Sequence, residues 1–328
     1  MRMPSHGEDM TMTSLWSNLG NVQGAETLEE ALEVSGLTWE VELRPIFFEH
    51  TLTGEDAVDY DQAENPDGVE YEHIPTHNSV IRLDNQFPLG VVGSRYVPIQ
   101  IREALSIMEG IAGSDKDLEY HSAGCINGGA RVWMLFQING MAIDPCGGDE
   151  LAPFVLVSTA HDGSRATRCN FVLRRELDLS MCVLGRTIAI RHTSSAAKKL
   201  ERAQEVFDIA VGQFELFENL AAGLADIKMT DDEWQEFLDE LIPPPDLALK
   251  RPGKTIKKRD TLTDLFAQGV QAQKKVEHTK WAAFSAVMSY TSNHASYRGG
   301  VDGKLNSLWF GSGNATTQKA LDLLTGGM

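Results

Sequence analysis

The first half of the chain alternates apolar and polar residues with the period of two that is typical of half-buried β-strands. The clearest case is 38–48, where Trp39, Val41 and Leu43 share one face. Helical spacing of apolar residues predicts a short helix that begins at Thr27. Further elements of this half are expected as strands at 79–83, as two short strands within 89–100 around Gly93-Ser94, and as an embedded helix over 101–111.

Turn dipeptides predict several hairpins in the middle of the chain. Asn127-Gly, Asn139-Gly140 and Asp162-Gly163 each stand between apolar runs, which is the strongest short-range hairpin signal. The connections are too short for helical crossovers, so we expect a mostly antiparallel sheet. Its strands are predicted at 118–125, 131–138, 141–144, 154–159, 165–173 and 182–190.

The hydrophobic period changes to that of a helix after residue 195. Apolar residues from Leu200 to Leu224 form one face of a long helix. Thr230 and Glu233 form a capping-box pattern that opens the next helix, and Pro243 ends it. Three later helices are expected, one from Thr261, one through 281–288, and one that Asn314 caps and that continues to Leu324.

These patterns predict an α+β fold, with a mostly antiparallel sheet and an embedded helix, followed by a helical C-terminal half. We expect a flexible N-terminal tail at 1–26 and a β-rich α+β domain at 27–195 that contains an acidic loop at 50–76. A helical region at 196–328 follows, with a basic linker at 243–260.

Charge is distributed unevenly along the chain. The formal net charge is −18, but residues 1–80 alone hold seventeen Asp and Glu against two basic residues. Residues 160–202 hold nine Lys and Arg against four Asp and Glu, and residues 248–280 hold nine against three. The basic stretches are either solvated surface or a groove that attracts phosphates.

Composition and motifs exclude several classes of protein. With 42% hydrophobic and 23% charged residues the chain is globular, and no apolar run is long enough for a membrane span. The first residues lack an apolar signal core, so we expect no secretion. The four cysteines form no CxxC pair, and Pro75 prevents His73 and His77 from sharing a helix face as metal ligands.

No catalytic signature occurs, and no phosphate-binding glycine loop indicates a nucleotide cofactor. His161 lies in a turn predicted at Asp162-Gly163, and a catalytic pair with Ser158 would lack a third member. A metal-dependent nuclease would have to use scattered carboxylates such as Asp144 and Asp149. We therefore expect no cofactor and no metal, and favour a protein that is not an enzyme.

Basic residues follow the strands and the helix start of the middle region. Because side chains in a strand alternate faces, Arg168 and Arg174 share one face and Arg165 and Arg175 the other. Basic side chains beside exposed aromatic rings are typical of single-strand binding. The predicted nucleic-acid contacts are Arg95, Tyr96, Arg165, Arg168, Arg174, Arg175, Arg191, Lys198 and Lys199.

Six segments together resemble a phage and plasmid family filed as domain of unknown function nine-three-two. They are residues 37–45, 89–100, 129–133, 156–164, 190–193 and 308–313. The resemblance implies a bacteriophage or mobile-element product that acts in the cytoplasm of a host bacterium, and it implies no established activity. In the order of its elements the chain is also similar to phage single-strand annealing proteins, which assemble into rings or filaments and use no nucleotide cofactor.

Three hypotheses of function follow. The first is a phage-encoded protein of DNA recombination that binds and anneals single-stranded DNA and forms a homo-oligomer. The second is a non-enzymatic interaction or structural protein that binds another phage or host protein, for instance through residues 1–80. A hydrolase or nuclease remains the third possibility, and none of the three involves a membrane.

Overall fold

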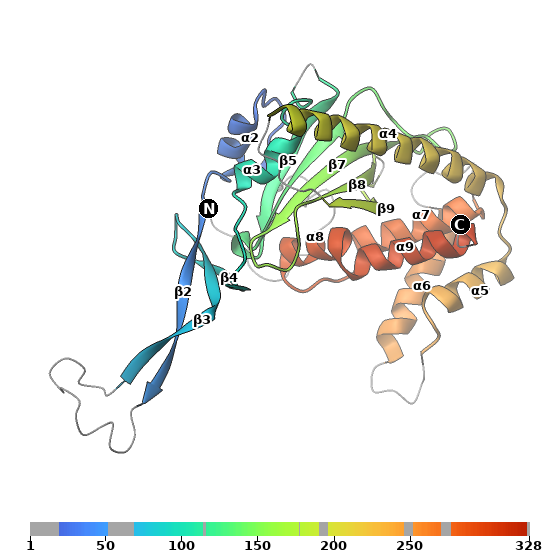
Figure 1. The fold of residues 1–328 in the computed structure, drawn as a ribbon. Helices are drawn as coiled ribbons and strands as arrows, with labels where there is room; N and C mark the ends of the chain where they lie inside the picture. Colours follow the sequence, from blue (N-terminus) through green and yellow to red (C-terminus); the bar gives the residue numbers. More distant parts are fainter. Residues whose placement is uncertain are drawn as a thin grey trace.

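The computed structural model describes residues 20–51, 69–113, 116–176, 178–189, 196–245, 252–269 and 277–326. Its centre is an antiparallel sheet of six strands in the order β1-β5-β6-β7-β8-β9 (Figure 1). The strands are β1 (Gly20–Asn21), β5 (Leu118–Ile126), β6 (Arg131–Ile138), β7 (Leu151–Ala160), β8 (Arg168–Arg175) and β9 (Met181–Ala189). With the helical C-terminal half described below, this confirms the predicted α+β class.

Local turn chemistry sets the hairpins. The β5–β6 connection passes through Asn127 at φ 54° and Gly128 at φ 68°, left-handed conformations that Asn and Gly tolerate best. The β7–β8 connection has Gly163 at φ 74°, and the Asp162 carboxylate accepts a hydrogen bond from the Ser164 amide at 2.9 Å. The hairpins predicted at Asn127 and at Asp162-Gly163 are confirmed. The hairpin predicted at Asn139-Gly140 is not formed, because β6 pairs with β5 and β7 instead.

Helices cover both faces of this sheet, so its strands are buried on both sides. On β6, Val132, Met134 and Phe136 belong to the core cluster that includes α4 (Ala196–Asp226). The alternate residues Trp133 and Leu135 belong to a second cluster with α8 (Gly300–Phe310). All ten residues of β7 are buried as a result.

Further helices surround this core. The first face also carries α2 (Leu28–Ser35) and α3 (Ile101–Leu105), and α3 continues into the 3-10 turn Ser106–Met108. The C-terminal half adds α5 (Asp231–Leu241), α6 (Pro252–Gln268), α7 (Lys280–Ser289), a π turn at Tyr290–His294, and α9 (Ser312–Thr325). None of the described helices combines the length and the apolar character that a membrane crossing requires.

A second sheet contains β2 (Val41–Thr51), β3 (Val69–Arg82) and β4 (Pro88–Gly93) in that order. The outer parts of β2 and β3 project from the body as an arm (Figure 1). The predicted acidic loop at 50–76 needs correction, because β3 begins at Val69; residues 52–68 lie outside the described part. The second short strand predicted after Gly93-Ser94 is not formed.

Other predicted boundaries also change. The basic linker expected at 243–260 is helical from Pro252, because proline lacks the N–H that the first turn of a helix leaves unpaired. The helix expected to begin at Thr261 therefore starts nine residues earlier. Asn314 lies inside α9 and does not cap it, and 141–144 contributes only a bridge between Ile143 and Leu151. Two elements were missed: α8, and β1 within the expected tail.

Hydrophobic clusters on both faces of the sheet join the β-rich and helical halves. Phe171 of β8 and Phe214 of α4 have ring centroids 6.0 Å apart. Trp133 of β6 and Trp309 of α8 lie at 4.9 Å on the opposite face. The expected division at residue 195 thus follows the change from strands to helices, while the packing crosses it.

Candidate nucleic-acid interface

Arg131 and Arg165 approach the same aromatic ring at one end of the large sheet. Arg131 begins β6, Arg165 lies between β7 and β8, and Phe310 ends α8. The two guanidinium carbons lie 4.7 Å and 5.6 Å from the centroid of the Phe310 ring. Arg165 also donates to the Phe310 carbonyl oxygen at 3.2 Å. Three segments distant in sequence therefore place two positive charges beside one ring.

No carboxylate of the described residues forms an ion pair with either guanidinium. Arg131 donates to the side-chain oxygen of Asn306, a neutral acceptor. Burial lowers the pKa of Arg131, the neighbouring Arg165 lowers it further, and Asp162 acts in the opposite direction. Because desolvation and like-charge repulsion both act on Arg131, a bound anion would relieve this site.

Arg168 lies on the same sheet face. It is the cross-strand partner of Ser158, which in turn is the partner of Trp133. Directly paired residues share a face, so Arg168 shares that of Trp133 and, two residues along β6, of Arg131. The Arg168 Nε is buried and has no hydrogen-bond partner in the described structure. We call Arg131, Arg165 and Arg168 the arginine cluster.

The turn after β4 lies beside this cluster. The Tyr96 hydroxyl donates to the Ala160 carbonyl oxygen at 3.3 Å, and burial followed by the charge of Asp162 raises the Tyr96 pKa. A Cβ atom on Gly90 would lie 2.8 Å from the Asp162 Cα, so β4 needs glycine at this close approach. Tyr96 is therefore half-buried and helps to hold this turn against the end of β7. Arg95 is exposed and forms no ion pair with a described carboxylate.

Arg174 lies at the far end of β8. Its guanidinium forms an ion pair with Glu176 at 2.6 Å and lies 5.1 Å from the centroid of the Phe154 ring. A nitrogen of Arg174 is also 3.3 Å from His121 Nε2. Glu176 already neutralises this charge, so Arg174 has less to gain from a phosphate than the arginine cluster.

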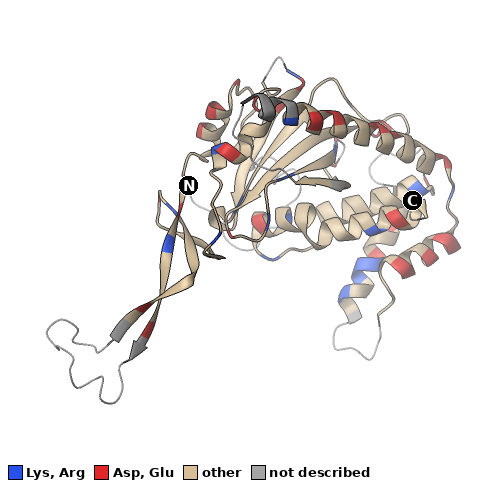
Figure 2. Cartoon of the chain, viewed as in Figure 1, with Lys and Arg blue, Asp and Glu red and all other residues tan. Residues whose placement is uncertain are grey.

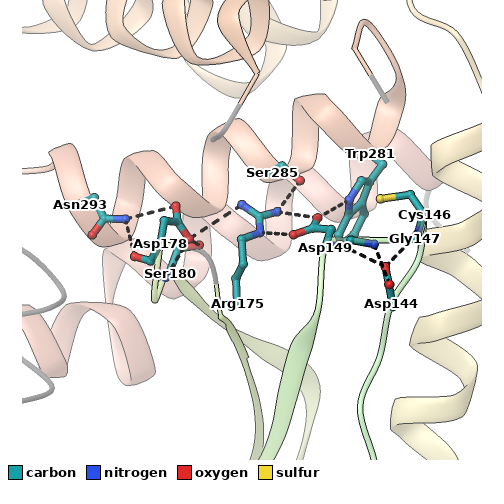
Figure 3. A network of polar contacts seen from close by, with 11 residues as sticks. Asp144, Cys146, Gly147, Asp149, Arg175, Asp178, Ser180, Trp281, Ser285 and Asn293 are labelled. Atoms are coloured by element: carbon teal, nitrogen blue, oxygen red, sulfur yellow. Dashed lines mark hydrogen bonds and ion pairs between the residues drawn. The ribbon is translucent and has the colours of Figure 1, made fainter. Parts of the chain in front are cut away.

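Arg175 is not a surface residue, which corrects its predicted role as a phosphate contact. Its side chain is 0% exposed, and its Nε lies 2.7 Å from Asp149 Oδ1 (Figure 3). It donates to Asp149 at 3.2 Å and to Ser285 of α7 at 2.6 Å. Strand alternation assigned its face correctly, but the helices cover that face.

The other predicted contacts cannot be placed. Arg191 lies outside the described residues, and Lys198 and Lys199 belong to α4 while their side chains lie outside the description. Helices cover both faces of the large sheet, so its described residues form no open basic groove on either face. The arginine cluster occupies one end of the sheet, and the sequence analysis missed Arg131. Its position directly after the Asn127 turn was the available signal.

His161, between the cluster and the small sheet, is 1% exposed. Its ring lies 5.6 Å from that of Trp39 in an edge arrangement, and Arg82 covers Trp39 at 4.0 Å. Neither ring nitrogen has a hydrogen-bond partner among the described residues, so the pair with Ser158 is not formed. Burial lowers the pKa of His161 to about 4, although Asp162 opposes this shift.

No group of three or more His, Cys, Asp or Glu side chains in the described residues is arranged to hold a metal ion. The four cysteines are free thiols, and Cys169 and Cys182 are buried. Burial raises the pKa of Cys182 to about 12 and raises that of Cys169 further. These two thiols are therefore protonated and unreactive at neutral pH.

The family described as "Domain of unknown function (DUF932)" matches residues 88–309, more than half of the sequence. The chain belongs to this family. The matched region contains the whole arginine cluster, together with Arg95, and it begins at the first residue of β4. The DUF932 match thus leaves out β2 and β3. No curated protein and no solved structure matches the chain.

Proposed function

We propose that the chain binds single-stranded DNA through Arg131, Arg165 and Arg168, with Arg95 beside them, and anneals complementary strands without a nucleotide cofactor. The observation that carries the proposal is the pair of guanidinium groups on the Phe310 ring, neither of which has a carboxylate partner in the described structure. A recombination role in a bacteriophage, as the sequence resemblance implies, is part of the same proposal.

Electrostatics favours an anionic ligand at this cluster. Seven other arginines of the described residues form ion pairs with carboxylates; they are Arg44, Arg82, Arg102, Arg174, Arg175, Arg202 and Arg259. The chain has a net charge of −18, so carboxylates are in excess, and yet the arginines of this cluster have no carboxylate partner in the described structure. A phosphate backbone supplies the missing negative charges and releases counterions when it binds.

An exposed aromatic ring packs against the turn that leads into Arg131. Phe87, which is 49% exposed, packs against Gly128, where an added Cβ would be 3.3 Å from the Phe87 ring. Gly128 precedes Arg131 by three residues in the tight β5–β6 connection. An exposed ring beside phosphate-binding arginines is suited to stacking with an unpaired base. This arrangement favours single strands, because the bases of a duplex are already stacked.

The proposal is tested with the full chain, a fluorescent oligothymidylate and complementary oligonucleotides. At about 50 mM salt, where phosphate contacts are strongest, we expect binding by anisotropy and faster pairing than without protein. The variant Arg165→Gln/Arg168→Gln should weaken both activities by at least about tenfold, because two charge-assisted contacts are lost. Arg102→Gln, at an exposed ion pair with Glu29, serves as the matched control. Failure of the native chain to bind at this salt would overturn the proposal.

A further inference from the structure

The arm formed by β2 and β3 presents aromatic residues to solvent. Phe47 pairs with His73 and Glu49 with Tyr71 across the ribbon. Phe47 is 51% exposed and Tyr71 68% exposed. Strand β4 pairs with β3 only from His77 onward, so the outer arm is a two-stranded ribbon without a third strand. Such ribbons are marginally stable in water by themselves, so this surface has apolar area to bury.

The arm is also strongly acidic. No Lys or Arg occurs in the sequence between Arg44 and Arg82, whereas this stretch contains nine Asp and Glu. Glu49 and Glu72 are exposed on the outer arm, and Figure 2 shows acidic positions on both of its strands. A partner must therefore offer both positive charge and apolar surface.

The first turns of α6 offer both. Lys254 and Lys257 are exposed and form no ion pair with a described carboxylate, and Ile256 between them is 40% exposed. Lys258 lies 5.5 Å from the Tyr290 ring. The first turn of α6 contains no acidic residue, so these lysines oppose the helix dipole. An acidic ligand would relieve that repulsion.

We propose that the acidic arm of one copy binds the basic start of α6 on a second copy. Figure 2 shows that the arm and α6 lie at opposite ends of the molecule, so they cannot meet within one chain. Phe47, Glu49 and Tyr71 share one face of the ribbon, because Phe47 pairs with His73 and Glu49 with Tyr71. Glu49 would face Lys254 and Lys257, and Phe47 and Tyr71 would cover Ile256. Two different surfaces form this head-to-tail contact, which repeats into a ring or a filament.

Sedimentation of the full chain without nucleic acid tests this contact. At about 100 μM protein and about 50 mM salt we expect oligomers, which dissociate at about 1 M salt because exposed charges are then screened. Glu49→Gln/Tyr71→Ser and Lys254→Gln/Lys257→Gln, which remove contacts without reversing any charge, should each give monomers. Glu33→Lys/Glu215→Lys changes exposed carboxylates elsewhere and should assemble as the native chain does. Circular dichroism verifies that each variant is folded.

A mixture of the arm variant and the α6 variant gives the sharpest result. Each retains one working surface, so the mixture should form dimers and nothing larger, whereas an arm that bound a second arm would let the α6 variant associate by itself. A monomeric native chain at low salt, or oligomers that survive either double substitution, would overturn the proposal. Because no nucleic acid is present, these outcomes are independent of DNA binding.

Discussion

Arg175 and Asp149 form an ion pair in which neither side chain is exposed, with 2.7 Å between Nε and Oδ1. Trp281 of α7 donates its indole N–H to the same carboxylate at 2.8 Å, and Ser285 accepts from Arg175 (Figure 3). The pair therefore joins the end of β8 and the segment before β7 to a helix more than a hundred residues later. It fixes the helical half onto the sheet.

Arg175→Met should lower the free energy of unfolding by about 3–5 kcal/mol, because Asp149 stays buried without the guanidinium. Urea denaturation followed by circular dichroism measures the change. Arg102→Met, at an ion pair that is about half exposed, should cost at most about 1 kcal/mol. If Arg175→Met cost no more than this control, the proposed role of the pair would be wrong. Asp149→Leu added to Arg175→Met should recover part of the loss.

Stability should depend on pH through His161. Burial lowers its pKa to about 4 from the ordinary 6.5, so the unfolded chain binds more protons than the folded chain between these values. The contribution of the neutral His161 side chain to the free energy of unfolding is fully present above pH 6.5. It is lost as the pH falls to 4, and the total loss is about 3 kcal/mol. Denaturant titrations across this range measure the slope.

His161→Phe keeps a ring against Trp39 and removes the titrating nitrogens, so it should reduce the slope. His121, whose pKa burial and Arg174 lower to about 4, should maintain the remainder. The exposed His294 provides the control variant His294→Asn, which should leave the slope as it is. If the dependence of the unfolding free energy on pH were unchanged in His161→Phe, protonation of His161 would not be linked to folding.

Salt dependence should distinguish Arg165 from Arg174. Each phosphate contact on a single strand contributes about 0.7 to the slope of log affinity against log salt. Arg165→Gln should reduce the slope by this amount, because the Arg165 guanidinium has no carboxylate partner in the described structure. Arg174→Gln should leave it unchanged, because Glu176 already neutralises Arg174 at 2.6 Å. Equal effects of the two variants would place the binding surface elsewhere.

The start of α5 rests on a capping box. The Thr230 hydroxyl accepts from the Glu233 amide at 3.2 Å, and the Thr230 amide donates to the Glu233 carboxylate at 2.7 Å. Thr230→Ala should destabilise the chain by about 1 kcal/mol, measured by thermal or urea unfolding. Thr230→Ser retains the hydroxyl and should cost less than about half of this. A loss as large in the serine variant would argue against the cap.

The sequence by itself determined the features that depend on neighbouring residues. The Asn127 and Asp162 turns, the Thr230 cap and the long apolar face of α4 all appear where they were predicted, because a few consecutive residues contain the whole signal. The α+β class followed from the same periodicities. Alternation along β8 also separated Arg174 from Arg175 correctly.

Tertiary structure decided everything that depends on which segments meet. Alternation cannot say that helices cover both faces of a sheet, so only the structure buries Arg175 against α7 and brings Arg131 to Arg165 beside Phe310. The extension of β3 to Val69 and the start of α6 at Pro252 likewise occur in polar stretches with weak local signals. Pairing and packing with distant residues supply the free energy that orders such stretches, and no local pattern records it.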